Sequence, residues 1–92
     1  MDQKSQGYFI VKNDRGLHTR PSTEIVRLAT SFKSEIKLRY QKMDVNAKSL
    51  LGILMLSAAK GSKILITAFG KDALEAVEAL QALAESNFHT SY

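Results

Sequence analysis

The chain alternates between two hydrophobic periods, one typical of strands and one typical of helices. Residues 7–13 are rich in aromatic and β-branched side chains and lead into a turn-like segment, so they predict a first strand. From Thr19 onward, apolar side chains recur every three or four residues, which predicts a helix. Pro21 lies near its start, where a missing N–H is no loss. This places His18 at the N-terminal edge of the helix.

A second change of period follows this helix. Residues 35–40 alternate strictly between polar and apolar side chains, which is typical of a half-buried strand. The period of two continues at Met43, Val45 and Ala47. We therefore expect a hairpin and a short third strand.

Residues 50–56 predict a short second helix. All of them except Gly52 carry large apolar side chains, and Ser49 stands immediately before them as a suitable N-cap. Gly61 is expected to end the segment, since glycine adopts the left-handed conformation without steric penalty.

The last third of the chain predicts a strand and a long helix. Residues 64–69 are nearly all apolar or β-branched and are expected to form a central strand. Asp72 and Glu75 have the spacing of a capping box. The predicted buried side of the helix that follows consists of Leu74, Val77, Leu80, Leu83 and Ala84. Residues 86–92 show no period, so they are expected to be a loose tail.

These elements predict one α/β (α+β) domain that covers residues 1–92. Three one-faced helices in so short a chain can bury their apolar sides only against one face of a four-stranded sheet. We therefore expect an open-faced β-sandwich of order βαββαβα, with an antiparallel sheet and the helices on one face.

Composition and charge narrow the function classes. The 92 residues contain no cysteine and two histidines, which argues against disulfide scaffolds and zinc sites. A signal peptide and a membrane-length apolar run are not recognisable, so a cytoplasmic location without membrane insertion is expected. Residues 1–71 hold 13 basic and five acidic side chains, whereas residues 72–92 hold four acidic and no basic ones. The basic side chains are dispersed without interleaved aromatics, so we expect a solvated face and no nucleic-acid partner.

The loop before the first long helix carries the strongest chemical signal. A helix N-terminus presents unpaired N–H groups to an anion. His18 adds a nucleophilic imidazole there, and Arg20 adds a guanidinium fork matched to a phosphate. Together they predict a histidine that carries a phosphoryl group. A solvated turn histidine is the alternative that composition leaves open, while His89, in the predicted tail, is expected to be exposed and uninvolved.

Two motifs resemble a known family. Residues 16–21, GLHTRP, are similar to the phosphoacceptor signature of HPr, the small phosphocarrier of the bacterial phosphoenolpyruvate-dependent sugar phosphotransferase system. Residues 48–54, KSLLGIL, resemble the regulatory-serine signature of the same family, and residues 59–61 resemble its following turn. The likeness extends over nearly the whole chain and implies the fold derived above.

The resemblance also implies roles for named residues. His18 would be phosphorylated on Nδ1 by Enzyme I and would pass the group to sugar-specific Enzyme IIA components, with Arg20 neutralising the phosphate. The protein would then be a phosphoryl carrier rather than an enzyme, without a cofactor or metal and as a monomer. Thr19 stands where alanine is common in the family, which removes no motif residue.

The second motif predicts a regulatory and a docking site. Ser49 is explained fully as a helix N-cap, but the resemblance implies phosphorylation there by an HPr kinase/phosphorylase. Leu50, Leu51 and Leu54 share a face at steps of three and four and are expected to form an exposed docking patch, whereas Ile53 and Leu56 point to the core. From the residues alone, the alternative is that the C-terminal tail covers this face. The resemblance adds Thr19, Thr23 and Arg27 on the first helix as partner contacts.

Two alternatives to the phosphocarrier stay open. One is a regulatory binding module for carbon or nitrogen control, in which phosphorylated Ser49 and the leucine patch recruit a transcriptional regulator or an enzyme. The other is a small nucleic-acid binder that uses the basic face, which salt-dependent DNA retention would support. The sugar, the permeases and the purpose of the tail are not readable from the sequence.

Overall fold

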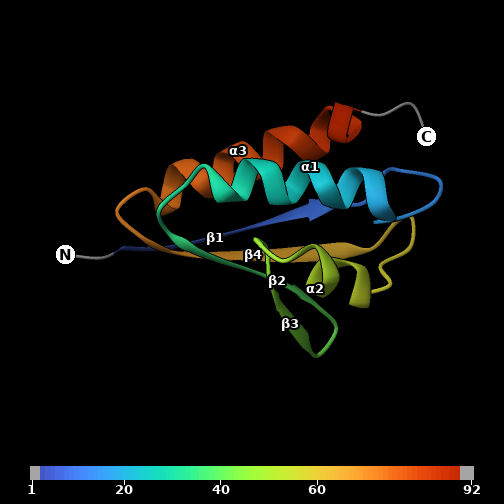
Figure 1. Ribbon diagram of the computed structural model, residues 1–92, viewed down its shortest axis with the longest axis horizontal. Coiled ribbons are helices and arrows are strands. Elements are labelled where there is room, and N and C mark those ends of the chain that lie inside the picture. Colours follow the sequence, from blue (N-terminus) through green and yellow to red (C-terminus); the bar gives the residue numbers. More distant parts are fainter. Residues whose placement is uncertain (1–2, 90–92) are drawn as a thin grey trace.

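The computed structural model describes residues 3–89, which form a four-stranded sheet and three α-helices in the predicted order (Figure 1). The elements are β1 (Gln3–Ile10), α1 (Thr19–Thr30), β2 (Glu35–Tyr40), β3 (Met43–Asn46), α2 (Leu50–Met55), β4 (Lys63–Gly70), α3 (Ala73–Glu85) and the short 3-10 turn η1 (Asn87–His89). The open-faced α+β sandwich is therefore confirmed, with α1 and α3 lying side by side over the sheet.

The sheet has the strand order β1-β4-β2-β3 and is antiparallel throughout. This order confirms β4 as a central strand. The first strand begins four residues earlier than predicted and ends at Ile10, because its polar start pairs with β4 from Gln3 opposite Gly70. An edge strand with one solvated face tolerates such polar residues, so hydrophobicity alone misses them.

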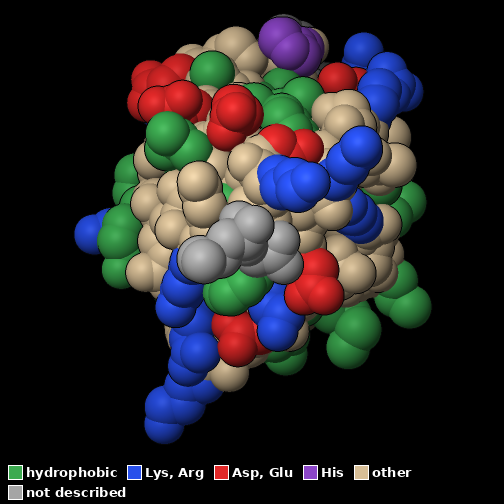
Figure 2. Space-filling view, turned by 90° about the vertical axis from the view of Figure 1, so that its left-hand side faces the viewer, with side chains coloured by type: hydrophobic (Ala, Val, Ile, Leu, Met, Phe, Trp, Pro, Cys, Tyr) green, Lys and Arg blue, Asp and Glu red, His purple; other side chains and the backbone are tan. Residues whose placement is uncertain are grey.

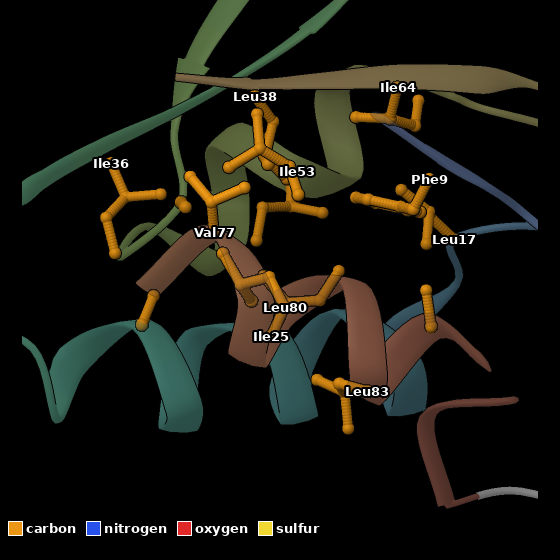
Figure 3. Close-up of a cluster of buried hydrophobic side chains, with 14 of the residues drawn as sticks. Phe9, Leu17, Ile25, Ile36, Leu38, Ile53, Ile64, Val77, Leu80 and Leu83 are labelled. Carbon is orange, nitrogen blue, oxygen red and sulfur yellow. The ribbon is translucent and has the colours of Figure 1, made fainter. Parts of the chain in front are cut away.

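The hydrophobic core fills the space between the sheet and the helices (Figure 3). Ile36 and Leu38 of β2 project towards Ile25 of α1, Ile53 of α2 and Leu80 of α3, and all five are almost completely buried. Alternation along the strands sends their other side chains to the opposite face, which no helix of the described chain covers. The sequence period thus fixes which face of the sheet is exposed.

The C-terminal end of α2 differs from the prediction. The helix stops at Met55, with Leu56 as C-cap, and Ser57 rather than Gly61 adopts the left-handed conformation after it, at φ 51°. Gly61 lies further along, in the turn that leads into β4, at φ 91°. The glycine was correctly expected in a left-handed conformation, but it serves a different turn.

The start of α3 was also predicted wrongly in part. Asp72 is the N-cap residue, but its side chain makes no capping bond to α3 within the described chain. It accepts hydrogen bonds from the backbone N–H groups of Lys33 and Ser34, each at 2.9 Å, and from the Ser34 hydroxyl. Leu74, expected on the buried side, is exposed. Residues Val77, Leu80, Leu83 and Ala84 are buried as predicted.

Residues 86–89 are not the loose tail that the sequence suggested. Asn87, Phe88 and His89 all have positive φ values, and this tight turn brings the Phe88 ring into the core. Phe88 is 0% exposed and meets Phe9 edge to face at a centroid distance of 5.8 Å. Burial of a phenylalanine stabilises such an irregular turn although the segment shows no hydrophobic period. Residues 90–92, the rest of the predicted tail, lie outside the described residues.

At one end of the molecule, one group of acidic side chains lies apart from a row of basic ones (Figure 2). Figure 2, which looks at the end where the N-terminus lies, shows Asp and Glu side chains at the upper left and a column of Lys and Arg side chains at the lower left.

Within residues 3–89 no helix is long and apolar enough to cross a membrane.

Candidate functional site

His18 stands at the N-cap of α1, as the hydrophobic period predicted. Its backbone is extended, at φ −80° and ψ −170°, and its carbonyl accepts the first helical hydrogen bond from Ser22 N–H at 3.1 Å. In the described chain its side chain does not cap the helix. The imidazole is half-buried, and its Nε2 atom is buried.

The loop before His18 is fixed by its contact with the segment after α2. Leu17 is buried and donates its N–H to the Ala58 carbonyl at 2.9 Å. Gly16 has φ 69°, and a Cβ added there would lie 2.3 Å from the same carbonyl oxygen. Only glycine therefore allows the loop to pack so closely, and this contact sets the position of His18.

An ion pair joins the same two segments at the surface. Lys60 Nζ lies 2.9 Å from Asp14 Oδ1. Hydrogen bonding to Lys60 and its positive charge lower the pKa of the Asp14 carboxyl, and Asp14 in turn raises the pKa of the Lys60 ammonium. Both side chains are largely exposed, so the pair adds little stability but keeps the loop charges balanced.

The first turn of α1 carries positive charge and no acidic side chain. Arg20 and Thr19 are exposed on it, and Thr23 is half-buried with its hydroxyl donating to the Thr19 carbonyl at 2.7 Å. Arg27, one turn further on, is exposed and lies 3.8 Å from Glu24. The structure thus brings His18 and Arg20 together at a helix N-terminus that favours anions.

Ser49 is confirmed as the N-cap of α2. Its Oγ accepts a hydrogen bond from the Gly52 N–H at 3.0 Å, and its carbonyl accepts the N–H of Ile53 at 3.1 Å. A Cβ on Gly52 would lie only 3.2 Å from Ser49 Oγ and 3.3 Å from Val45 Cβ. Room for the cap and for β3 therefore explains the glycine at this position.

The α2 patch, defined here as Leu50, Leu51, Leu54 and Met55, is an apolar surface in which Leu54, predicted to be exposed, is only half-buried. Leu51 is 70% exposed and Met55 58% exposed, while Ile53 and Leu56 are buried as expected. The turn η1 packs against α1 and α3, so residues 87–89 do not cover the patch. Met55 was not predicted for it, although its position four residues after Leu51 on one helix face was a usable signal.

His89 is separate from this site. It is exposed, as expected, and lines a hollow of about 300 Å³ beside α1. The other lining residues are Glu24, Arg27, Leu28, Ser31 and Leu83. In the described part of the chain, no group of three His, Asp or Glu side chains could hold a metal ion.

A family model agrees with the motif. The model described as the PTS HPr component phosphorylation site matches residues 6–86, which is nearly the whole chain. This match covers the His18 loop, Ser49 and the α2 patch.

Solved structures agree with the fold. The HPr-C-His structure from Thermoanaerobacter tengcongensis has a TM-score of 0.90 and 36% identity, over 96% of this chain and 99% of that one. Phosphocarrier protein HPr from Bacillus anthracis str. Ames has a TM-score of 0.81 and 40% identity, over 86% and 94% of the two chains. Crh, the catabolite repression protein of Bacillus subtilis, has a TM-score of 0.73 and 34% identity over 83% and 87%, in an intertwined dimer with a swapped domain.

Proposed function

This chain belongs to the HPr family of the phosphotransferase system, and we propose that it is a phosphocarrier whose His18 accepts a phosphoryl group from phospho-Enzyme I. His18 passes the group to an Enzyme IIA component during sugar uptake in the cytoplasm. The chain is then a protein substrate rather than an enzyme in its own right. The observation that carries this proposal is the position of His18 at the N-terminus of α1, two residues before an exposed arginine.

The geometry favours Nδ1 of His18 as the acceptor atom. Nε2 is buried, so a donor protein reaches the ring from the Nδ1 side. The Nδ1 lone pair forms the bond to phosphorus as the bond to the donor's leaving group breaks, and the reverse step delivers the group to the acceptor. The helix N-terminus and Arg20 stabilise the phosphate oxygens.

Partner docking is assigned to the surface next to the phosphoacceptor. The two helices α1 and α2 pack against each other, so the exposed part of α1 and the α2 patch form one continuous side of the molecule. An exposed apolar patch with basic neighbours fits a partner that has an apolar centre and an acidic rim. The proposed contacts are Thr19, Thr23, Arg27, Leu50, Leu51 and Leu54, with Met55 added from the structure.

A regulatory role at Ser49 is the second candidate function, and the similarity to Crh favours it. Ser49 lies at a helix N-terminus directly before the α2 patch. A phosphate on its hydroxyl would be stabilised by the helix dipole and would repel an acidic partner. An HPr kinase/phosphorylase would supply the phosphate, and a transcriptional regulator would bind the modified face.

Label transfer from radioactive phosphoenolpyruvate in the presence of Enzyme I tests the proposal. We expect acid-labile label on the wild type and on the control His89→Ala, and no label on His18→Ala. A folded wild type that takes no label would overturn the phosphocarrier and leave the Ser49-based regulator. Sedimentation of the unlabelled protein tests the expected monomer, since relatives such as Crh form dimers.

A further inference from the structure

The face of the sheet turned away from the helices carries an ordered set of side chains. Strand pairing places Lys4, Phe69 and Glu35 in one row across β1, β4 and β2. Tyr8, Leu65 and Arg39 form another row on the same face. The register thus brings two exposed aromatic rings, 61 residues apart in the sequence, to neighbouring strands of one surface.

The two aromatic rings are accessible and well separated. Tyr8 is 53% exposed and Phe69 is 50% exposed. Tyr8 pairs with Leu65, four residues before Phe69, so the rings are offset by about 13 Å along the strands at ~3.3 Å per residue. At this offset each ring can receive a different flat group of one extended ligand.

Each ring has a basic side chain in contact with it or on the neighbouring strand. Lys63 Nζ lies over the face of the Tyr8 ring, 4.3 Å from its centroid, so a base that stacks on that face has to displace the ammonium. Lys4 is the direct cross-strand neighbour of Phe69. Strand alternation places four basic side chains on this face of the described sheet, namely Lys4, Lys37, Arg39 and Lys63. The two acidic ones are Glu35 and Asp44, and Asp44 is paired with Arg39 at 3.2 Å.

Three open hollows follow the same face. The largest, about 590 Å³, is lined by Lys33, Glu35, Phe69, Gly70 and Lys71. Another is lined by Lys4, Glu35, Lys37, Thr67 and Phe69. The third is lined by Tyr8, Arg39, Gln41, Lys63 and Leu65. Each hollow therefore combines at least two basic side chains with one of the two rings.

We propose that this open sheet face binds single-stranded nucleic acid. Stacking of bases on exposed aromatics, combined with cations that follow the phosphates, is the general mode of such binding, and four-stranded sheets provide it in RNA-binding domains. The hollows are too open to enclose a small ligand, which needs most of its surface buried. An acidic peptide would use the cations but leave the rings unused.

The open sheet face and the phosphoacceptor use different surfaces. His18 and the α2 patch belong to the helical layer and its loops, whereas the rings lie on the opposite side of the sheet. Nucleic-acid binding and phosphoryl transfer are therefore compatible in one molecule. The inference does not depend on the proposed function of His18, and either can fail without the other.

Fluorescence anisotropy of a labelled single-stranded oligo(dT) of about 20 nucleotides, longer than the ~4–16 that one small domain contacts, tests the proposal. We expect Tyr8→Thr and Phe69→Thr each to weaken binding about tenfold, while Phe69→Tyr keeps the affinity. Lys37→Gln should lower the salt slope by about one. Matched controls away from the open sheet face are Leu74→Thr on α3 and Lys12→Gln, whose side chain pairs with Glu85 of α3, and both should bind like the wild type.

Three results would overturn the proposal. The first is that the wild type fails to bind the oligonucleotide at low salt. The second is that both threonine variants, shown to be folded by circular dichroism, bind as the wild type does, since this would leave only unspecific attraction of a polyanion. The third is binding to phosphatidylserine vesicles in preference to the oligonucleotide, which would identify a lipid surface as the occupant instead.

Discussion

The N-termini of α1 and α2 differ in how the N–H groups of the first helical turn, which have no partner within the helix, are satisfied. At α2, the Ser49 hydroxyl accepts the Gly52 N–H, so the cap is internal to the chain. At α1, His18 occupies the equivalent position and its side chain does not cap the helix it precedes. The N-terminus of α2 is capped by its own side chain, whereas that of α1 is not, and under the proposed function an anion bound to His18 would take this place.

This difference predicts different structural effects of a phosphate at the two helix N-termini. A phosphate on His18 would add a partner to a helix end that its own side chain leaves uncapped. A phosphate on Ser49 would have to replace an existing hydrogen bond beside Gly52, where there is little spare room. Modification of Ser49 should therefore rearrange the start of α2, while modification of His18 should leave α1 unchanged.

The largest loss of stability is expected from Gly16→Ala, because this change disrupts the packing of the loop before α1 against Ala58. The new Cβ would lie 2.3 Å from the Ala58 carbonyl oxygen at a positive φ, so we expect a loss of about 3 kcal/mol in the free energy of unfolding. Urea denaturation measures it. Gly61→Ala is the control: its φ is also positive, but the Cβ meets open space among the described residues, so only about 1 kcal/mol should be lost.

Arg20→Gln should come next and should act on transfer rather than on stability. Loss of a charge-assisted hydrogen bond to the phosphate, worth about 2 kcal/mol, predicts a roughly 30-fold slower transfer from phospho-Enzyme I. Rapid-quench labelling measures the rate. Arg27→Gln removes the same charge one turn away, and an equal slowing in that variant would show that Arg20 acts only through general electrostatic attraction.

Ser49→Ala and His18→Ala compare the two termini directly. Removing the Ser49 cap should cost about 1 kcal/mol of unfolding free energy. Removing the His18 side chain should change the same quantity by less than about 0.5 kcal/mol, since that side chain does not cap its helix. Thermal denaturation of both variants measures the difference. Equal losses would contradict the contrast drawn between α1 and α2.

The smallest effect is expected at the third helix, where Asp72 supports the α1–β2 connection. Hydrogen bonds from Ser34 and Lys33 hold the pKa of the Asp72 carboxyl below its ordinary value of 3.8. Its stabilising contribution is thus fully present above this pH and is lost as the pH falls through the lowered pKa. In acid titrations, the unfolding free energies of wild type and Asp72→Asn should differ near neutral pH and converge as the pH falls through the lowered pKa. A gap that persists in strong acid would contradict this origin.

The sequence predicted what depends on periodicity. The order of elements, the burial of Ile53 and Val77, and the places of His18 and Ser49 at helix starts all follow from regular spacing and capping chemistry. The resemblance to the family motif then proposed His18 as the phosphoacceptor and Ser49 as a regulatory serine within that frame. These features are local, so a single stretch of sequence contains the information.

What the sequence did not predict depends on distant contacts. Phe88 is buried by Phe9, which lies at the other end of the chain. Asp72 binds the backbone before β2 instead of its own helix. The shared face of Tyr8 and Phe69 exists only through the register of β1 with β4. Such contacts depend on the tertiary arrangement and are not visible in the spacing of hydrophobic residues along the sequence.

The strand order also has a kinetic consequence. The β2–β3 hairpin can form from residues that are close in the sequence. The pairing of β1 with β4 joins strands that are separated by two helices and this hairpin, so it requires the closure of a long loop. The entropy of closing that long loop is lost before the pairing contributes stability. We therefore expect refolding to be slower than for a helical bundle of this size, and we expect the pairing of β1 with β4 to be the rate-limiting step.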